Sequence, residues 1–85
     1  MFLSNATEEE IELLHGRVSN NVKHYRLKKD MSQLELALTI GMKSAAFFGN
    51  AENNTNDKHF NIEHIYKISK ALNIPMADFL EPLQE

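Results

Sequence analysis

Apolar residues recur at intervals of three and four along most of the chain, which is the spacing of helices that bury one face. In the first third of the sequence this spacing joins Ile11, Leu14, Val18, Val22 and Tyr25. No segment of useful length alternates apolar and polar residues, as a half-buried strand would. The pattern therefore predicts an all-α fold.

Polar residues mark where the first helices begin. Thr7 and Glu10 can form a capping box, in which each side chain accepts a hydrogen bond from the other residue's backbone N–H, and Ser32 and Glu35 repeat the motif. Gly16 falls within the first apolar pattern. Because glycine weakens a helix interior, this region is predicted to be either one helix with a weak point or two helices with a bend.

Four further helices are predicted after the first. We expect a short second helix that ends near Ile40, a third helix over 43–51 and a polar loop over 53–57. Asn61 is the expected cap of a fourth helix, and Pro75 suits the first turn of a short fifth helix. The predicted inward-facing residues of the fourth helix are Ile62, Ile65, Ile68 (or Ser69) and Leu72.

Gly41 separates the second predicted helix from the third. Glycine adopts a positive φ without steric cost, so it can end one helix and turn the chain steeply into the next. Ala37, four residues earlier, is small enough to let two helix backbones approach closely. Two short helices that meet at roughly 90–120° form a helix-turn-helix, whose second helix fits the major groove of DNA. An ordinary helical hairpin with a glycine cap fits these residues equally well.

The basic residues are concentrated in the middle of the chain. The net charge of all 85 residues is −3, but the nine Lys and Arg all lie within residues 17–70, together with only five of the twelve acids. This segment has a net charge of +4, and binding responds to the local field rather than to the total charge. The distribution suits a polyanionic partner, and it suits solvated helix faces equally well.

A set of residues that extends from the first predicted helix to the end of the third matches a known pattern. They are Val18, Val22, Tyr25, Arg26, Ser32, Gln33, Glu35, Leu36, Ala37, Ile40, Gly41 and Glu52. With these residues the chain resembles the Cro/CI-type, lambda-repressor-like helix-turn-helix family. The stretch from Lys67 to Leu80 is similar to the end of the same family's domain. The resemblance implies a five-helix DNA-binding domain over 17–80, preceded by an acidic helical extension (1–16) and followed by a short tail (81–85).

The resemblance also implies roles for individual residues. Gln33 would contact a phosphate or hold the third helix in place. The residues that would face the groove are Lys43, Ser44, Ala45, Phe48 and Gly49. Those that would meet phosphates are Asn54, Asn56, Lys58 and the backbone near Asn61. Arg26 and Glu52 stand where the family has an ion pair that braces the first helix against the third.

The spacing between Gly41 and Glu52 is one residue longer than is usual in the family. If positions are counted forward from Gly41, Phe47 lies in the core. If they are counted back from Glu52, Phe48 and Ala51 lie there instead. One of the two phenylalanines is expected to be buried, and the sequence allows either.

Three leucines stand where the family more often has polar residues, namely Leu27, Leu34 and Leu38. Leu34 and Leu38 are one helical turn apart and share a face, so together they would form an exposed apolar patch. We expect either the N-terminal segment around Ile11, Leu13 and Leu14 or a second subunit to cover this patch, and we favour the N-terminal segment.

The first hypothesis for function is a sequence-specific, double-stranded DNA-binding transcriptional regulator of bacterial or phage type. It would act as a repressor, read the major groove with the helix at 43–51, and bind two-fold sites as a homodimer. The alternative is a protein-interaction or antitoxin-like module on the same fold, with weak or no DNA binding. The basic middle and the polar loop favour DNA. The few polar groove-facing residues and the surplus leucines favour the alternative.

No other chemistry emerges from the sequence. The four histidines lack the spacing of a zinc site, and the serines have no accompanying base, so we expect no metal, cofactor, small-molecule ligand or enzymatic activity. The chain contains no cysteine, which is compatible with a reducing compartment. It shows no signal-peptide pattern and no apolar run that could span a membrane. A cytoplasmic location is therefore expected.

Overall fold

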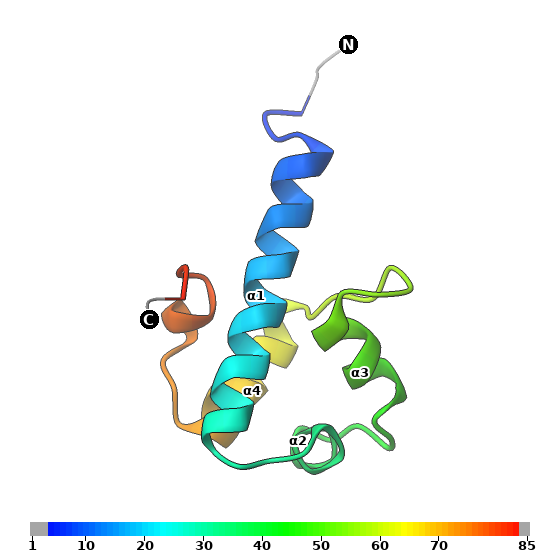
Figure 1. Ribbon diagram of the computed structural model, residues 1–85, viewed down its shortest axis with the longest axis vertical. Coiled ribbons are helices and arrows are strands. Elements are labelled where there is room, and N and C mark those ends of the chain that lie inside the picture. Colours follow the sequence, from blue (N-terminus) through cyan, green and yellow to red (C-terminus); the bar gives the residue numbers. More distant parts are fainter. Residues whose placement is uncertain (1–3, 84–85) are drawn as a thin grey trace.

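The computed structural model describes residues 4–83, which form an all-helical domain (Figure 1). Its elements are α1 (Glu8–Lys28), α2 (Gln33–Thr39), α3 (Ala46–Asn53), α4 (Ile62–Leu72) and the 3-10 turn η1 (Met76–Phe79). No strand occurs in this part of the chain, so the all-α prediction is confirmed. The predicted count of five α-helices is wrong, because the last element is a 3-10 turn. Residues 1–3 of the predicted extension and 84–85 of the predicted tail lie outside the described residues.

The first helix, α1, is a single helix of 21 residues, so Gly16 does not divide it. Its second half lies within the domain, whereas its first half extends beyond the other helices, as Figure 1 shows. Val18 and Val22 are buried, but Ile11 and Leu14 remain 43% and 41% exposed. The apolar spacing therefore identified the helix correctly and overestimated how much of its length is buried.

Polar side chains fix the helix starts as the sequence predicts. Thr7 Oγ1 accepts from the Glu10 N–H at 3.1 Å, and Glu10 Oε1 accepts from the Thr7 N–H at 2.8 Å. Ser32 forms the same capping box at α2. Asn61 caps α4, where its Oδ1 accepts from the His64 N–H at 2.8 Å. These bonds satisfy backbone donors that a helix start leaves unpaired.

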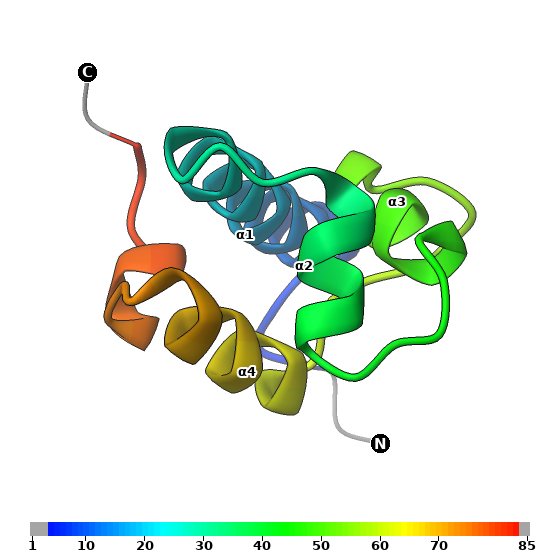
Figure 2. The ribbon, with the colours of Figure 1, turned by 90° about the horizontal axis from the view of Figure 1, so that it is seen from below.

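The core lies where α2, α3, α4 and η1 surround the second half of α1 (Figure 2). Its fully buried large side chains are Val22, Leu36, Phe48, Ile68, Leu72 and Phe79, together with the polar Asn21. The predicted inward positions Ile65, Ile68 and Leu72 of α4 are buried, but Ile62 is 77% exposed and its prediction is wrong. No helix in residues 4–83 is long and apolar enough to cross a membrane.

Candidate nucleic-acid interface

Gly41 ends the α2 segment as the sequence predicts, with a positive φ of 91°. Its N–H donates to Leu38 O at 3.1 Å, and the Met42 N–H donates to Ala37 O at 2.9 Å. The two bonds occupy carbonyls that the helix end leaves free. The chain then leaves α2 in a new direction, and α3 follows after a turn (Figure 2).

The helix that was predicted over 43–51 has different bounds. It begins at Ala46 and ends at Asn53. Ser44 Oγ accepts from the Ala46 N–H at 3.3 Å, so this serine closes the turn in front of the helix. The turn before the helix therefore contains Lys43, Ser44 and Ala45, which were predicted to lie on the helix. Lys43 and Ser44 are exposed, and Ala45 is half-buried.

The choice between the two phenylalanines is settled by burial. Phe48 and Ala51 are 0% exposed, whereas Phe47 is half-buried with its ring 5.3 Å from that of His64. Positions counted back from Glu52 give the correct register, and the extra residue is accommodated in the turn before α3. Phe48 is thus a core residue, and its predicted contact with the groove is wrong.

This register defines an outer face of α3 of which the predicted site included Gly49 alone. Ala46, Gly49, Asn50 and Asn53 follow one another at the spacing of a single helix face. Ala46 and Asn53 are exposed, and the two between them are half-buried. The signal was present in the sequence, because placing Phe48 and Ala51 inside leaves these positions outside.

The predicted ion pair between Arg26 and Glu52 is confirmed. Arg26 donates from Nε and Nη2 to the two oxygens of Glu52, both at 2.8 Å, and the side chains are 7% and 0% exposed. Arg26 Nη1 also donates to Met31 O at 2.6 Å. The bidentate geometry fixes α3 against α1 in one orientation.

Gln33 holds this pair from the α2 side. Its Nε2 donates to Glu52 Oε1 at 3.1 Å, so the side chain connects the start of α2 with α3. Gly49 leaves the space that this glutamine uses, since a Cβ at Gly49 would lie 3.2 Å from Gln33 Oε1. Of the two predicted roles for Gln33, holding the third helix is the one that the contacts describe.

The loop after α3 uses its polar side chains mainly for internal contacts. Asn54 has a left-handed φ of 56° and donates from Nδ2 to Glu12 Oε2 at 3.4 Å. Asn56 donates from Nδ2 to Asn50 Oδ1 at 2.8 Å. Lys58 is exposed. Of the three loop side chains predicted to contact phosphates, that of Lys58 alone makes no such internal contact in the described residues.

Two histidines that the predicted site did not include connect this loop to α1. The rings of His15 and His59 stack at 3.8 Å with 9° between their planes. Burial and the neighbouring His59 lower the pKa of His15, and the nearby Glu12 opposes this change. No spacing rule connects a helix residue to a loop residue so far away in the chain, so no pattern in the sequence predicts this contact.

The exposed leucines of α2 are not covered by residues 4–16, the described part of the N-terminal segment. Leu34 and Leu38 are 49% and 54% exposed. Figure 1 shows the start of α1 at the end of the molecule opposite α2. The favoured expectation was therefore wrong, because α1 continues as a straight helix instead of folding back.

Together, α2, the Gly41 turn and α3 define a helix-turn-helix. The sequence profile of the helix-turn-helix family matches residues 22–79, which is more than half of the chain. The chain belongs to this family, the Cro/CI-type helix-turn-helix proteins, a class of DNA-binding regulators. No curated protein and no solved structure matches it significantly.

Proposed function

We propose that the chain is a transcriptional regulator that binds double-stranded DNA sequence-specifically and represses transcription by occluding a promoter. The observation that carries this proposal is the position of α3. Its inner face is fixed to α1 through Arg26 and Glu52, and its outer face is open to a partner. A rigidly held helix with a free outer face is what insertion into a major groove requires.

Base contacts are proposed for the turn before α3 and for its outer face. Ser44 and Asn50 can hydrogen-bond to base edges, and Ala46 can contact a thymine methyl group. Asn50 Oδ1 already accepts from Asn56, so Asn50 would offer its Nδ2 donor to an acceptor on a base. This surface is small and has few polar groups, so sequence preference would come from a few contacts.

Phosphate contacts are proposed for Lys43 and Lys58. Both are exposed, one in the turn before α3 and the other in the loop after it. These two segments lie on the α3 side of the molecule in Figures 1 and 2. Lysines at both ends of α3 would position the helix on the DNA backbone without adding sequence information.

Titration of duplex DNA at several salt concentrations tests the proposal. Affinity should fall steeply as salt rises, because bound cations are released from the phosphates. Lys43→Ala and Lys58→Ala should each weaken binding to all sequences and reduce the salt slope by about one. Lys70→Ala is the matched control, since Lys70 is exposed on α4, where it lies 5.7 Å from the Tyr66 ring.

The alternative function is a protein-interaction or antitoxin-like module. It is favoured by the exposure of Leu34 and Leu38, which form an apolar patch on α2. Absence of DNA binding at about 50 mM salt, where phosphate contacts are strong, would favour this alternative. Binding to DNA that Leu34→Ser and Leu38→Ser leave unchanged would favour the regulator.

A homodimer is part of the proposed function. Helix-turn-helix proteins that read two-fold sites place two recognition helices about 34 Å apart, one helical turn of DNA. The molar mass of the complex, and the symmetry of sequences selected from a random pool, would test this stoichiometry.

A further inference from the structure

Three consecutive residues in the middle of α1 point in three directions. Ser19 Oγ donates to Ala51 O of α3 at 2.7 Å, and Asn21 Nδ2 donates to Phe79 O of η1 at 2.8 Å. Asn20, between them, is exposed. Successive residues of a helix are rotated by about 100°, so α3 and η1 lie on opposite flanks of α1. The face centred on Asn20 points away from the domain.

This outward face continues along α1 as a stripe of residues, which we call the Asn20 stripe. It consists of Glu9, Leu13, Gly16, Asn20 and Leu27, which share one face at helical spacing. Leu13 and Leu27 are 72% and 56% exposed. These two leucines, which lie on either side of Asn20 and are exposed, give the stripe an apolar character.

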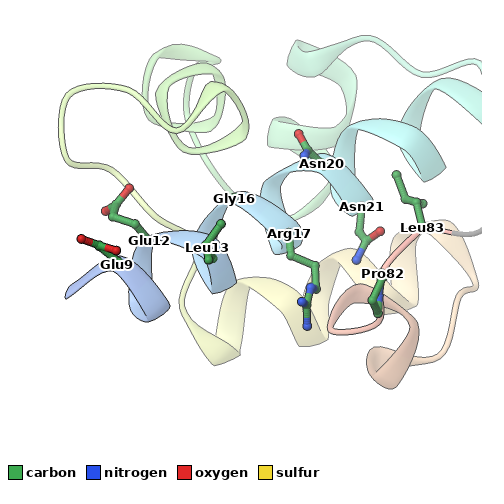
Figure 3. Close-up of a pocket in the computed structure, with 9 residues that line it drawn as sticks. All are labelled: Glu9, Glu12, Leu13, Gly16, Arg17, Asn20, Asn21, Pro82 and Leu83. Atoms are coloured by element: carbon green, nitrogen blue, oxygen red, sulfur yellow. The ribbon is translucent and has the colours of Figure 1, made fainter. Parts of the chain in front are cut away.

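A groove of about 710 Å³ runs beside the stripe and includes four of its residues (Figure 3). Pro82 and Leu83, which follow η1, line the groove where it passes Asn21. The groove is thus lined by residues of α1 and, at one end, by the last described residues of the chain. It offers a recess into which a side chain from another helix can fit.

Gly16 lies in this groove, and no packing partner within residues 4–83 requires a glycine there. A Cβ added there would meet nothing within 4 Å. Its φ is not positive, so its backbone conformation is open to any residue. Glycine within a helix is destabilising relative to alanine. Close approach of a second molecule is a physical reason for its presence at this position.

The charges of α1 favour one particular partner, a second α1 in the opposite direction. The helix begins with Glu8, Glu9 and Glu10, and the basic residues of its second half include Lys23 and Lys28. In an antiparallel pair, the acidic start of each helix faces the basic end of the other. The two helix dipoles are also antiparallel, which is the favourable arrangement. A parallel pair would place like charges together.

We propose that the Asn20 stripe is the homodimer interface, with two α1 helices packed antiparallel and the two-fold axis passing between the Asn20 residues. With this axis, residue n lies opposite residue 40 − n of the other chain. Leu13 then meets the partner's Leu27 near the centre of the seam. Gly16 and the partner's His24 are at the same height but on opposite edges of the seam, as are Arg17 and the partner's Lys23.

The same symmetry places the two α3 helices on one side of the dimer. The two-fold axis is perpendicular to α1 and lies in the plane between the two helices, so it points towards the flank that α3 occupies. Rotation about it keeps a helix on that flank. Both α3 helices could then face the same duplex. This step rests on the proposed DNA-binding function, whereas the seam itself can be tested without DNA.

Cysteine cross-linking tests the position of the axis, and the chain contains no native cysteine that could interfere. Two packed helices have axes about 8–10 Å apart, which brings facing Cα atoms within disulfide range. Asn20→Cys should therefore give a covalent dimer under mild oxidation. Glu9→Cys is the control on the same stripe, because its two copies would be roughly 33 Å apart in an antiparallel pair. Cross-linking of Glu9→Cys but not of Asn20→Cys would overturn the arrangement.

Sedimentation equilibrium of the full chain tests the interface. The wild type should show twice the 9.8 kDa chain mass. Leu13→Glu should raise the dimer dissociation constant at least about tenfold, and Gly16→Leu should do the same while circular dichroism shows intact helices. Leu38→Glu is the matched control, since Leu38 is comparably exposed on α2. Dimers that Leu13→Glu leaves intact and Leu38→Glu dissociates would overturn the proposal.

The outcomes separate this inference from the proposed function. A chain that is monomeric at every concentration, yet binds DNA with the expected salt dependence, overturns the interface and leaves the function standing. A dimer that dissociates in Leu13→Glu but does not bind DNA at low salt supports the interface and contradicts the function.

Discussion

Among the polar contacts that join α1 to the segment that carries α3, two made by side-chain carboxylates differ in burial and in geometry. The inner contact is bidentate, between Arg26 and Glu52 at 2.8 Å, with side chains 7% and 0% exposed. The outer contact centres on Glu12, whose side chain is 59% exposed. Glu12 accepts from Asn54 Nδ2 at 3.4 Å and lies 3.9 Å from His59 Nε2.

The difference separates a contact that fixes α3 from one that only positions the loop after it. A buried charge that loses its partner cannot be solvated, so the inner contact has essentially one acceptable geometry. An exposed charge exchanges its partner for water at little cost, so the outer contact can change without unfolding the domain. The orientation of α3 is therefore rigid, while the loop that carries Lys58 can adjust to a partner.

The largest expected effect is that of removing one half of the inner contact. Arg26→Met leaves the Glu52 carboxylate buried with Gln33 as its remaining side-chain partner, so the free energy of unfolding should fall by about 3–5 kcal/mol. Urea denaturation monitored by circular dichroism measures the loss. If the single variant does not fold, Arg26→Met combined with Glu52→Leu should recover much of the stability, because no unpaired charge remains.

Arg17→Met is the matched control for this prediction. Arg17 lies on the same helix but is exposed, and its contact is a long hydrogen bond of 3.4 Å from Nη1 to Leu80 O. Its loss should change stability by less than about 0.5 kcal/mol. Equal losses for the two arginine variants would contradict the distinction between buried and exposed contacts.

A smaller effect is expected from Gln33, which supports the inner contact without being charged. Gln33→Leu removes the 3.1 Å hydrogen bond to Glu52, and the carboxylate keeps both bonds from Arg26. The loss should be about 1 kcal/mol, typical of a hydrogen bond whose acceptor stays partnered. A loss of stability as large as that of Arg26→Met would show that the inner contact depends on Gln33 as much as on Arg26. Affinity for DNA measured on the same variant would reveal any additional phosphate contact.

The inner contact could be predicted from the sequence, and the outer one could not. Arg26 and Glu52 are recognisable because they occur with a set of residues that the helix-turn-helix family arranges in a known way. Glu12, His15 and His59 belong to no such set. Their proximity depends on the length of α1 and on the path of the loop, and neither follows from local residue patterns.

The same division applies within the helix-turn-helix. Gly41 and the capping serine of α2 act through their own backbone or their nearest neighbours, so both ends of α2 followed from the sequence. The start of α3 did not, because Lys43, Ser44 and Ala45 are all compatible with a helix. Their turn forms because Phe48 and Ala51 must both be buried while Glu52 reaches Arg26, which is a tertiary requirement.

The outer contact should contribute little when its carboxylate is removed. Glu12→Ala eliminates the bond to Asn54 and the proximity to His59, and the expected loss is below about 1 kcal/mol, since exposed ion pairs rarely contribute more. Hydrogen exchange of the loop amides at residues 54–60 should nevertheless become faster. Faster exchange throughout α3 instead would show that the outer contact also holds the helix.

The smallest expected effect is that of pH on the stability contributed near the outer contact. Burial and the neighbouring His59 lower the pKa of His15 below its ordinary value of 6.5, against the opposing charge of Glu12. The unfolded chain therefore binds more protons than the folded chain once the pH falls below about 6.5, so stability should decrease from there downwards and be unaffected by this group at higher pH. Protonation of both stacked rings would also place two like charges 3.8 Å apart.

His64 also makes stability depend on pH in this range, so its contribution must be distinguished from that of His15. Burial lowers its pKa as well, with Glu63 and Lys67 acting in opposite directions, and its Nδ1 accepts the Asn61 N–H only while it is unprotonated. Urea denaturation at about pH 7.5 and about pH 5.5 spans the histidine range and stays above the ordinary range of carboxylates. His15→Gln should lose less stability across this interval than the wild type does, with the remainder due to His64. If His15→Gln has the same pH dependence of stability as the wild type, protonation of His15 does not affect the packing of the loop after α3 against α1. Changes in the outer contact would then involve Glu12 alone.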